Sequence, residues 1–439
     1  MGLHPDIRTY LQSEHAACIT ETWNPPRCPA VCVIDLMWLL FRFRGRTGLE
    51  LVRFVLRQAR DFYYAGGAHI ALLTDNPRAT PPQKHAEQKR RSAAARKRAR
   101  DDDGDGDDGA EIEAAMMSLA LDDTVAPTDM PRAFADRTFR ADLMRYLHRA
   151  VADAVIEWFR PPAGHSANEY TLITRFGEHG TTCYTWNGLR DRKWTTTTPT
   201  DGSSLARLRA NLDDDVHGEA DVAALHVVDF ASSSTPRREE AFRGARETGV
   251  IIRTVDSDSI PILLLHRERA GASSAPLHLW LVAGGSRSSA AVPSNDPEAN
   301  KLIWANESRR IVDIDALHDS VAAAGFTGTA FCAFCVIMGT DFNRKLICNA
   351  AYKTLRPHLV SWLRTVDNRE EASEWNAASI RRHCQRLRDM VGKRAALAAT
   401  AEDFERAAWS LLYWRNPRLA ADFASSSSSR TCHEEDKTK

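Results

Sequence analysis

The chain has 439 residues, of which 43% are hydrophobic and 26% charged, so it can bury a sizeable core and is not globally disordered. Lys and Arg total 58 and Asp and Glu total 58, and this balance excludes a uniformly basic surface for binding nucleic acid. No apolar run approaches the roughly 20 residues that span a bilayer, and the opening MGLHPDIRTY lacks the residue order of a signal peptide. The sequence predicts a soluble, intracellular protein without a membrane segment.

Short apolar runs that end in carboxylates recur along the chain. Residues 30–35 read AVCVID, residues 69–75 read HIALLTD and residues 250–258 read VIIRTVDSD. Such runs, separated by helical patterns, are typical of strands in a parallel sheet that is covered on both faces. Residues 276–283 and 309–315 are candidates for further strands. The sequence therefore predicts an α/β fold with a mainly parallel twisted sheet flanked by helices, in which the acids meet at the edge where ligands bind.

Two oppositely charged segments follow one another. Residues 84–100 carry eight Lys or Arg against one Glu in a composition that favours helix, and residues 101–113 carry six Asp and two Glu. The acidic run is too charged and too rich in glycine to pack, which predicts a mobile connector. The two runs cancel in the net charge.

The pattern becomes regular again beyond the connector. Residues 136–159 predict a helix, because Leu and Val recur at steps of four. A Thr-rich and aromatic segment at about 165–205 predicts a small β insertion, with Asn187-Gly188 at a hairpin turn. From Asp319 onward the pattern is helical until a low-complexity tail.

Nine scattered cysteines lack the dense spacing of a disulfide scaffold and indicate a reducing compartment. Cys332 and Cys335, and also Cys28 and Cys32, have spacings that a zinc site can use, but no second Cys or His pair lies nearby in the sequence. We interpret them as small buried hydrophobic residues in a helix and a strand.

Seven acids are candidates for chemistry. They are Asp35, Asp75, Glu219, Asp221, Asp256, Asp258 and Asp341. Residues 256–258 read D-S-D, and we call them the D-S-D segment. If the strand continues through this segment, its period of two would send both carboxylates to the same side. Ionised carboxylates that share a confined space repel one another, so a shared site needs cations, and Mg²⁺ or Mn²⁺ suits oxygen ligands. Two such ions would support hydrolysis of a phosphodiester. The alternative is that each acid is a solvated turn or cap residue.

The order and context of these acids resemble the flap endonuclease/XPG family of structure-specific 5′ nucleases. The opening MGLHPDIRTYL is similar to that family's start, and VCVIDLMWLLF is similar to its first acidic strand, with Asp35. The resemblance implies a PIN-like 5′-nuclease fold. It also implies that Gly2 lies near the active site and that Phe41 stacks on a base beside the scissile phosphate.

The segment HIALLTDNPRATPPQKHAEQKRR resembles the family's second acidic strand and the start of its basic helical arch. The resemblance implies that Lys84 and Arg90 hold the scissile phosphate and that Lys89 and Arg91 bind DNA. A solvated helix or a nuclear-localisation signal remains the alternative for the end of the basic run.

Three later segments complete the resemblance. GEADVAAL carries Glu219 and Asp221, VIIRTVDSDSIPILL carries Asp256 and Asp258, and FCAFCVIMGTDF carries Asp341. The family implies that Asp35, Asp75, Glu219 and Asp221 supply one ion site and that the other three acids supply the second.

One family element is missing. The family usually has a glycine-rich turn after the last acid, which holds K⁺ and the duplex, whereas residues 343–354 read NRKLICNAAYKT. Arg381, Arg382 and Arg386 are candidates for a substitute phosphate-binding helix, and a plain solvated helix is the alternative. In this departure and in its acidic connector, the chain resembles divergent members of the family from large DNA viruses.

The resemblance thus implies a hydrolase that depends on two Mg²⁺ or Mn²⁺ ions and cuts branched or flapped DNA in replication, recombination or repair, in the nucleus or at a cytoplasmic viral replication site. No small-molecule cofactor is expected. An RNA nuclease of the same superfamily and a non-catalytic DNA-binding or assembly factor are the alternatives. The expected regions are 1–100, the nuclease region with the basic arch; 101–135, the acidic disordered connector; 136–345, the internal nuclease region; 346–424, a helical region; and 425–439, a disordered tail.

Overall fold

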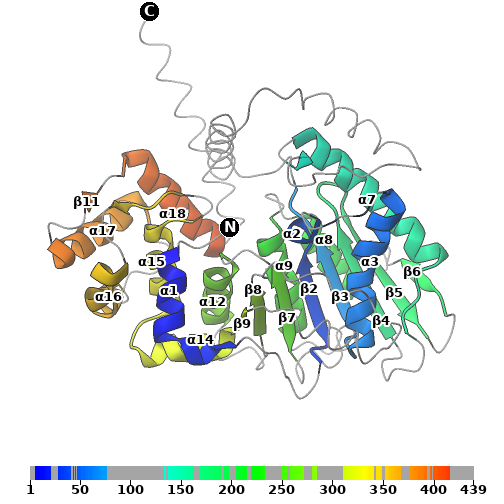
Figure 1. Cartoon of the computed structure of the whole chain (residues 1–439), viewed down its shortest axis with the longest axis horizontal. Helices are drawn as coiled ribbons and strands as arrows, with labels where there is room; N and C mark the ends of the chain where they lie inside the picture. Colours follow the sequence, from blue (N-terminus) through cyan, green and yellow to red (C-terminus); the bar gives the residue numbers. More distant parts are fainter. Residues whose placement is uncertain are drawn as a thin grey trace, which may run out of the picture.

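The computed structural model arranges the chain as a central sheet between helices, beside a mainly helical lobe (Figure 1). The described residues are 5–20, 28–40, 43, 45, 47–76, 133–134, 137–162, 169–188, 192–196, 204–214, 219–232, 249–254, 258–270, 279–283, 310–340, 343–348, 352–366, 375–392, 396–397 and 399–415. The expected acidic connector, the basic run and the tail lie outside them, so those expectations stay predictions.

The described strands form one nine-stranded sheet in the order β1-β9-β8-β7-β2-β3-β4-β5-β6. Their bounds are β1 (Ile19–Thr20), β2 (Val31–Asp35), β3 (His69–Leu73), β4 (Glu169–Arg175), β5 (Thr181–Asn187), β6 (Trp194–Thr196), β7 (Val250–Thr254), β8 (Leu279–Ala283) and β9 (Arg310–Asp313). A separate short pair joins β10 (Ile347–Cys348) to β11 (Ala396–Leu397).

Five neighbouring strands, β8-β7-β2-β3-β4, run parallel, and the strands beyond them on both sides are antiparallel. Along the chain, β3 and β4 are added on one side of β2, whereas β7 and β8 are added on the other side. The winding therefore reverses between β2 and β7. Open α/β sheets bind ligands at such a switch point, outside the carboxyl ends of the strands.

Helices cover both faces of the sheet, because consecutive residues of the central strands are apolar and need burial on both sides. Cys32 and Ile34 of β2 pack in a core with α3 and α7, whereas Val31 and Val33 pack in a second core with α9 and α12. The bounds of the helices at the sheet are α2 (Met37–Leu40), α3 (Gly48–Tyr64), α7 (Arg137–Glu157), α8 (Ser204–Asp213), α9 (Ala220–Ser232) and α12 (Ser259–Ala270).

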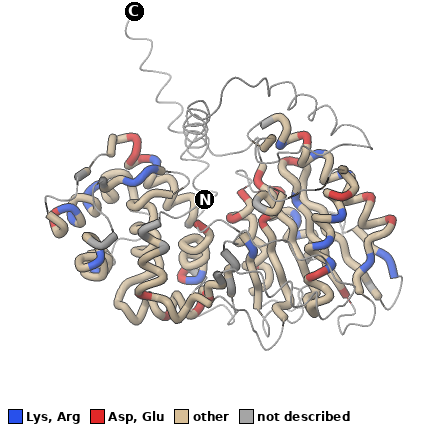
Figure 2. Tube along the Cα trace, in the orientation of Figure 1, with Lys and Arg blue, Asp and Glu red and all other residues tan. Residues whose placement is uncertain are grey.

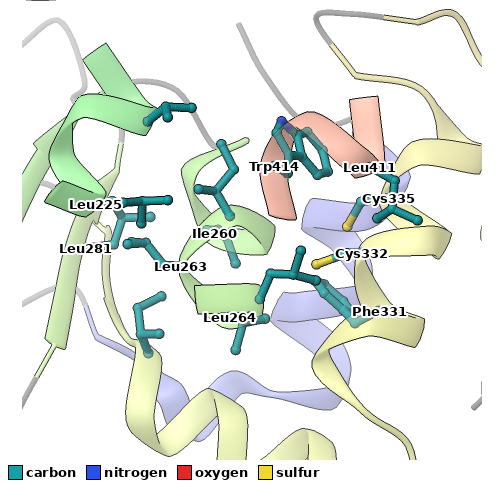
Figure 3. Close-up of a cluster of buried hydrophobic side chains, with 14 of the residues drawn as sticks. Leu225, Ile260, Leu263, Leu264, Leu281, Phe331, Cys332, Cys335, Leu411 and Trp414 are labelled. Carbon is teal, nitrogen blue, oxygen red and sulfur yellow. The ribbon is translucent and has the colours of Figure 1, made fainter. Parts of the chain in front are cut away.

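The second core continues into the helical lobe. Its elements are α1 (Pro5–Glu14), the short helix η1 (Ala16–Cys18), α14 (Ile314–Ala323), α15 (Gly328–Met338), α16 (Tyr352–Val366), α17 (Ala377–Val391) and α18 (Ala401–Arg415). Figure 3 shows α12 between the two parts: Leu263 lies towards Leu225 and Leu281 on the sheet side, and Leu264 lies towards Phe331 of α15. Helix α12 thus joins the sheet to the lobe.

The expected α/β class with a mostly parallel sheet flanked by helices is confirmed by this arrangement. The Thr-rich segment differs from the expectation of an insertion, since β4 is parallel to β3 and belongs to the central sheet. Its alternate residues Tyr170 and Leu172 pack in one core and Ile173 packs in the other, which explains why this strand is buried in the sheet. Asn187-Gly188 begins the connection between the antiparallel strands β5 and β6, as a hairpin requires.

Among the described residues, no single helix is long and apolar enough to cross a bilayer. Helices α14 and α15 meet that test of length and composition only as a pair, and they are bent by 97° at the break between them.

Candidate carboxylate site at the sheet edge

Five of the seven candidate acids are described, and all five lie where the parallel strands end or where the next helix begins. We call them the edge carboxylates: Asp35, Asp75, Glu219, Asp221 and Asp258. In the sheet, Asp35 is the register partner of Leu73, and Ile34 is the register partner of Arg253. The ends of β2, β3 and β7 are therefore level with one another at one edge.

Asp35 ends the central strand β2. It follows Val31 and Val33 at steps of two, so it lies on the face of the sheet that α9 and α12 cover. Its Oδ1 accepts a hydrogen bond of 2.9 Å from the backbone N–H of Met37, and its Oδ2 accepts one of 3.2 Å from the hydroxyl of Thr254. Because Thr254 ends β7, the second bond crosses the switch point of the sheet.

Asp75 connects the end of β3 to the start of α9. Its Oδ1 accepts a hydrogen bond of 2.9 Å from the backbone N–H of Ala220, the first residue of α9. Glu219 immediately precedes that helix, is 3% exposed, and accepts the first helical bond from Ala223 through its carbonyl. The contact therefore brings the Asp75 carboxylate to the backbone between Glu219 and Asp221.

Asp221 connects α9 to α12. Its Oδ1 accepts a hydrogen bond of 2.6 Å from the hydroxyl of Ser259, the first residue of α12. Asp258 precedes Ser259 and is 1% exposed. Asp258 is close enough to Cys335 of α15 for its charge to act on that thiol. Burial is the main reason why the pKa of the Cys335 thiol is well above its usual value, and the neighbouring Cys332 and the Asp258 carboxylate add to this effect.

Two helix N-termini face this edge. Glu219 and Asp221 lie at the start of α9, and Asp258 lies at the start of α12. The partial positive charge of a helix N-terminus stabilises nearby carboxylates, which offsets part of their mutual repulsion. The partial charges of these two helix N-termini thus help the fold to tolerate buried acids at this edge.

The five edge carboxylates do not form a metal cage by themselves. Among the described residues, no group of three or more His, Cys, Asp or Glu side chains has the geometry to hold a metal ion. Asp256 and Asp341 lie outside the described residues, as do Gly2, Phe41, Lys84, Lys89, Arg90 and Arg91. The roles expected for these eight residues stay predictions.

The described residues around Asp341 form a closed turn. Gly339 ends α15 with a φ of 100°, the backbone N–H of Thr340 donates to the carbonyl of Asn343 at 2.9 Å, and the Thr340 hydroxyl donates to Asn343 Oδ1 at 2.8 Å. The backbone N–H of Leu346 then donates to the carbonyl of Ile337 at 2.9 Å. The Thr340 and Asn343 side chains thus brace the turn that follows α15.

The turn after α15 is also fastened to the last helix. The guanidinium of Arg344 donates two hydrogen bonds to Asp403 near the start of α18, one of them from Nε to Oδ1 at 2.8 Å. Burial alone would raise the pKa of the Asp403 carboxyl, but the hydrogen bonds from Arg344 and Thr400 outweigh burial and lower it below its usual value. The ion pair therefore links α18 to the segment that follows the last candidate acid in the chain.

The basic helix proposed from sequence is α17. Arg381, Arg382 and Arg386 are exposed, whereas Ile380 and Leu387 on the same helix are buried. Helix α17 lies at the end of the lobe away from the sheet (Figures 1 and 2). The three arginines are thus exposed, but they do not line the sheet edge.

Sequence reasoning missed three polar residues at the edge. Thr254 and Ser259 donate the hydrogen bonds described above; in the sequence Thr254 stands two positions before Asp256, and Ser259 directly follows Asp258. Arg175 ends β4, is 4% exposed, and follows Ile173 at a step of two on the face that carries Asp35. The signal that could have identified it was a cation at the end of a strand whose preceding residues are buried.

Three of the four cysteines considered from sequence are buried in a helix or a strand as expected, whereas Cys28 is half-buried and lies before β2. Cys332 and Cys335 are completely buried in α15, and Cys32 is completely buried in β2. The Cys332 thiol donates to the carbonyl of Pro261 at 3.0 Å. These contacts are those of small core residues.

No protein-family model matches the chain, and no curated protein matches its sequence.

Proposed function

We propose that the chain is a divalent-metal-dependent phosphodiesterase with a PIN-like 5′-nuclease fold, and that its substrate is branched or flapped DNA. One observation carries the proposal: acids from four distant segments lie at the carboxyl edge of a parallel sheet, and hydrogen bonds join three of them to neighbouring elements, one of these bonds crossing the switch point. Solvated turn residues that were unrelated to one another would not be connected in this way.

The donor groups of the edge favour a cation. The hydrogen bonds to Asp35, Asp75 and Asp221 described above come from backbone amides and hydroxyls. Neutral donors orient a carboxylate without cancelling its charge. A site of oriented, ionised oxygen ligands suits Mg²⁺ or Mn²⁺.

The cage is completed, in this proposal, by Asp256 and Asp341. Asp256 stands in the sequence between Thr254 and Asp258, both of which lie at the edge, and Asp341 stands between Thr340 and Asn343, which close the turn after α15. The ions would be held by edge carboxylates together with Asp256 and Asp341, since the described acids alone form no group that could hold a metal ion. Two divalent ions held there would supply activation of a water and stabilisation of the charge on a departing phosphate oxygen.

The protein's own groups would position the substrate. The N-termini of α9 and α12 direct partial positive charge towards the edge and favour a phosphate there. Lys84 and Arg90 would hold the scissile phosphate, Gly2 and Phe41 would contact the adjoining nucleotide, and Lys89 and Arg91 would bind the strand beyond it. Arg381, Arg382 and Arg386 would bind a duplex arm at a distance from the edge, where phosphate contacts set orientation.

A cleavage assay tests the proposal. The full chain is incubated with Mg²⁺ and with end-labelled flap, junction, single-stranded and RNA substrates, beside Asp256→Ala, Asp221→Asn and the control Asp319→Asn, an acid that is 85% exposed on α14. We expect cleavage of a branched DNA by the wild type and the control, and its loss in the two site variants with substrate binding retained.

Three results would contradict the proposal. They are full activity of Asp256→Ala, equal activity with and without a chelator, and the absence of cleavage on every substrate. Cleavage confined to RNA would keep the chemistry and replace the substrate class.

A further inference from the structure

His15 is a buried histidine at the junction between the N-terminal helix and α14. It lies between α1 and η1 and is 3% exposed. Its Nδ1 forms a hydrogen bond of 2.8 Å with the hydroxyl of Ser320 in α14, and its Nε2 forms one of 3.2 Å with the hydroxyl of Tyr10 in α1. We call these three residues and Cys18 the His15 junction. The imidazole thus joins segments that lie 305 positions apart in the chain.

The His15 junction lies where the lobe meets the edge of the sheet. On the lobe side, the Tyr10 ring packs against Phe331 and Phe334 of α15, with ring centroids 6.1 and 6.0 Å apart (Figure 1). On the sheet side, β1 begins directly after Cys18 and pairs with β9, the strand that precedes α14. A change at the imidazole therefore acts at the point where both attachments of the N-terminal segment meet.

The surroundings of the imidazole favour its neutral form. A neutral imidazole has one donor and one acceptor nitrogen, and each neighbouring hydroxyl can take the complementary role. Burial lowers the pKa of His15 below its usual value of 6.5, and the Glu14 carboxylate opposes this effect only in part. Glu14 also forms an ion pair with Arg356 of α16 at 2.8 Å, which reduces the attraction that its charge would exert on an imidazolium.

The other charged groups near the junction act mainly on its thiol. Burial raises the pKa of Cys18, a hydrogen bond with Ser320 opposes this effect, and the carboxylates of Asp313 and Asp319 add to it. His318, a partly exposed histidine of α14, lies 3.3 Å from Asp319. The imidazole of His15 is therefore governed chiefly by its own burial.

We propose that His15 is a pH-sensitive latch, which holds α1 and η1 against α14 while its imidazole is neutral and loosens the His15 junction when the imidazole takes up a proton. The proton places a positive charge in a site that is 3% exposed, and burying a charge is costly unless it is closely paired. It also makes both ring nitrogens donors, so that both hydroxyls must accept from the ring. This inference is independent of the proposed function.

The sign of the pH dependence follows from the lowered pKa of His15. A histidine whose pKa is lowered by folding contributes stability that is present above its unfolded pKa, here 6.5, and that is lost as the pH falls through the folded pKa. At pH 5.5, one unit below 6.5, this linkage raises the equilibrium constant for opening of the junction by at most about tenfold.

The test is hydrogen–deuterium exchange of the full chain at pH 7.5 and pH 5.5, with rates corrected for the intrinsic effect of pH on amide exchange. The variants are His15→Gln, whose amide keeps a donor and an acceptor but does not titrate, and the matched control His318→Gln on α14. Far-UV circular dichroism at pH 7.5 shows that each variant is folded. Helix α3 is the internal reference, because it contains no histidine and packs in the other core.

In the wild type, we expect exchange in residues 5–20 and 314–323 to become faster at pH 5.5 by up to about tenfold, while α3 stays unchanged. His318→Gln should behave as the wild type does, and His15→Gln should show no acceleration. Equal acceleration in the wild type and His15→Gln, equal acceleration of α3, or no acceleration in the wild type would overturn the latch.

A second measurement needs no variant. Deuterium exchange at the imidazole C2 position, followed by mass spectrometry of peptides in which His15 is the only histidine, gives the pKa of this ring in the wild type. We expect a pKa below 6.5. A pKa of 6.5 or above would overturn the latch even if His15→Gln does not fold.

Discussion

The ion pair between Arg344 and Asp403 gives a prediction about the lobe that can be worked out in magnitude. Replacing Arg344 with Met keeps most of the aliphatic stem and removes the two charged hydrogen bonds to a carboxylate whose side chain is 5% exposed. Breaking a fully buried pair costs about 3–5 kcal/mol. Here the cost is lower, because the Arg344 side chain is 49% exposed and Asp403 keeps hydrogen bonds from Thr400 N at 2.7 Å and Oγ1 at 2.8 Å.

We therefore expect Arg344→Met to lower the free energy of unfolding by about 1–2 kcal/mol near neutral pH. The sign of the pH dependence follows from the lowered pKa of Asp403. A carboxyl whose pKa is lowered by folding contributes stability that is fully present above its unfolded pKa, which is 3.8 for this group, and loses it as the pH falls through the folded pKa. The difference between wild type and variant should shrink as the pH is lowered below about 4.

The assay is urea denaturation of the full chain at several pH values, with Asp403→Asn and the double variant completing a thermodynamic cycle. Arg356→Met is the control, because the Arg356–Glu14 pair at 2.8 Å has a 58% exposed arginine and should contribute less than about 0.5 kcal/mol. A loss for Arg344→Met no larger than that of the control, or a loss that persists unchanged at the lowest pH, would refute this reasoning.

Three further predictions concern the turn after α15, the core around α15 and the basic helix α17. Gly339→Ala should lower the free energy of unfolding by about 2 kcal/mol or more in urea denaturation, since Gly339 has a φ of 100° and an added Cβ would lie 2.8 Å from the Lys345 backbone nitrogen. Unchanged stability would contradict the conformation described for this turn. Phe334→Ala should cost about 3–5 kcal/mol, because this ring is completely buried in α15, and a cost below about 1 kcal/mol would show that the core there is loose. Replacing Arg381, Arg382 and Arg386 by Gln should reduce the salt dependence of DNA binding. The slope of log K against log salt concentration should fall in magnitude by about 0.9 for each phosphate that α17 no longer neutralises, and an unchanged slope would mean that these arginines do not contact DNA phosphates.

Short continuous apolar runs explain why the sheet could be predicted from sequence. The runs around Asp35, Asp75 and Thr254 are apolar on both faces and end in polar residues, and they became β2, β3 and β7 with their carboxyl ends level. The same pattern did not distinguish β4 from an insertion, because strand partners depend on contacts between distant segments and not on the local sequence. Turn residues such as Asn187-Gly188 indicate a hairpin, but they do not indicate which sheet it joins.

The site was predictable only in its acids. The carboxylates are conspicuous in the sequence, since each lies beside an apolar run, whereas Thr254 and Ser259 are common residues whose partners lie far away along the chain. Arg344 was likewise interpreted as part of a departure from a family motif, and its ion pair with Asp403 depends on how the lobe packs. Long-range hydrogen bonds of this kind follow from tertiary structure and leave no periodic signal.

The most direct measurement of the central claim is anomalous diffraction from crystals of the full chain grown with Mn²⁺. The account predicts anomalous peaks among Asp35, Asp75, Glu219, Asp221 and Asp258 at the carboxyl edge of β2, β3 and β7, with Asp256 and Asp341 completing the coordination. Peaks only at surface positions, or none at this edge, would contradict it.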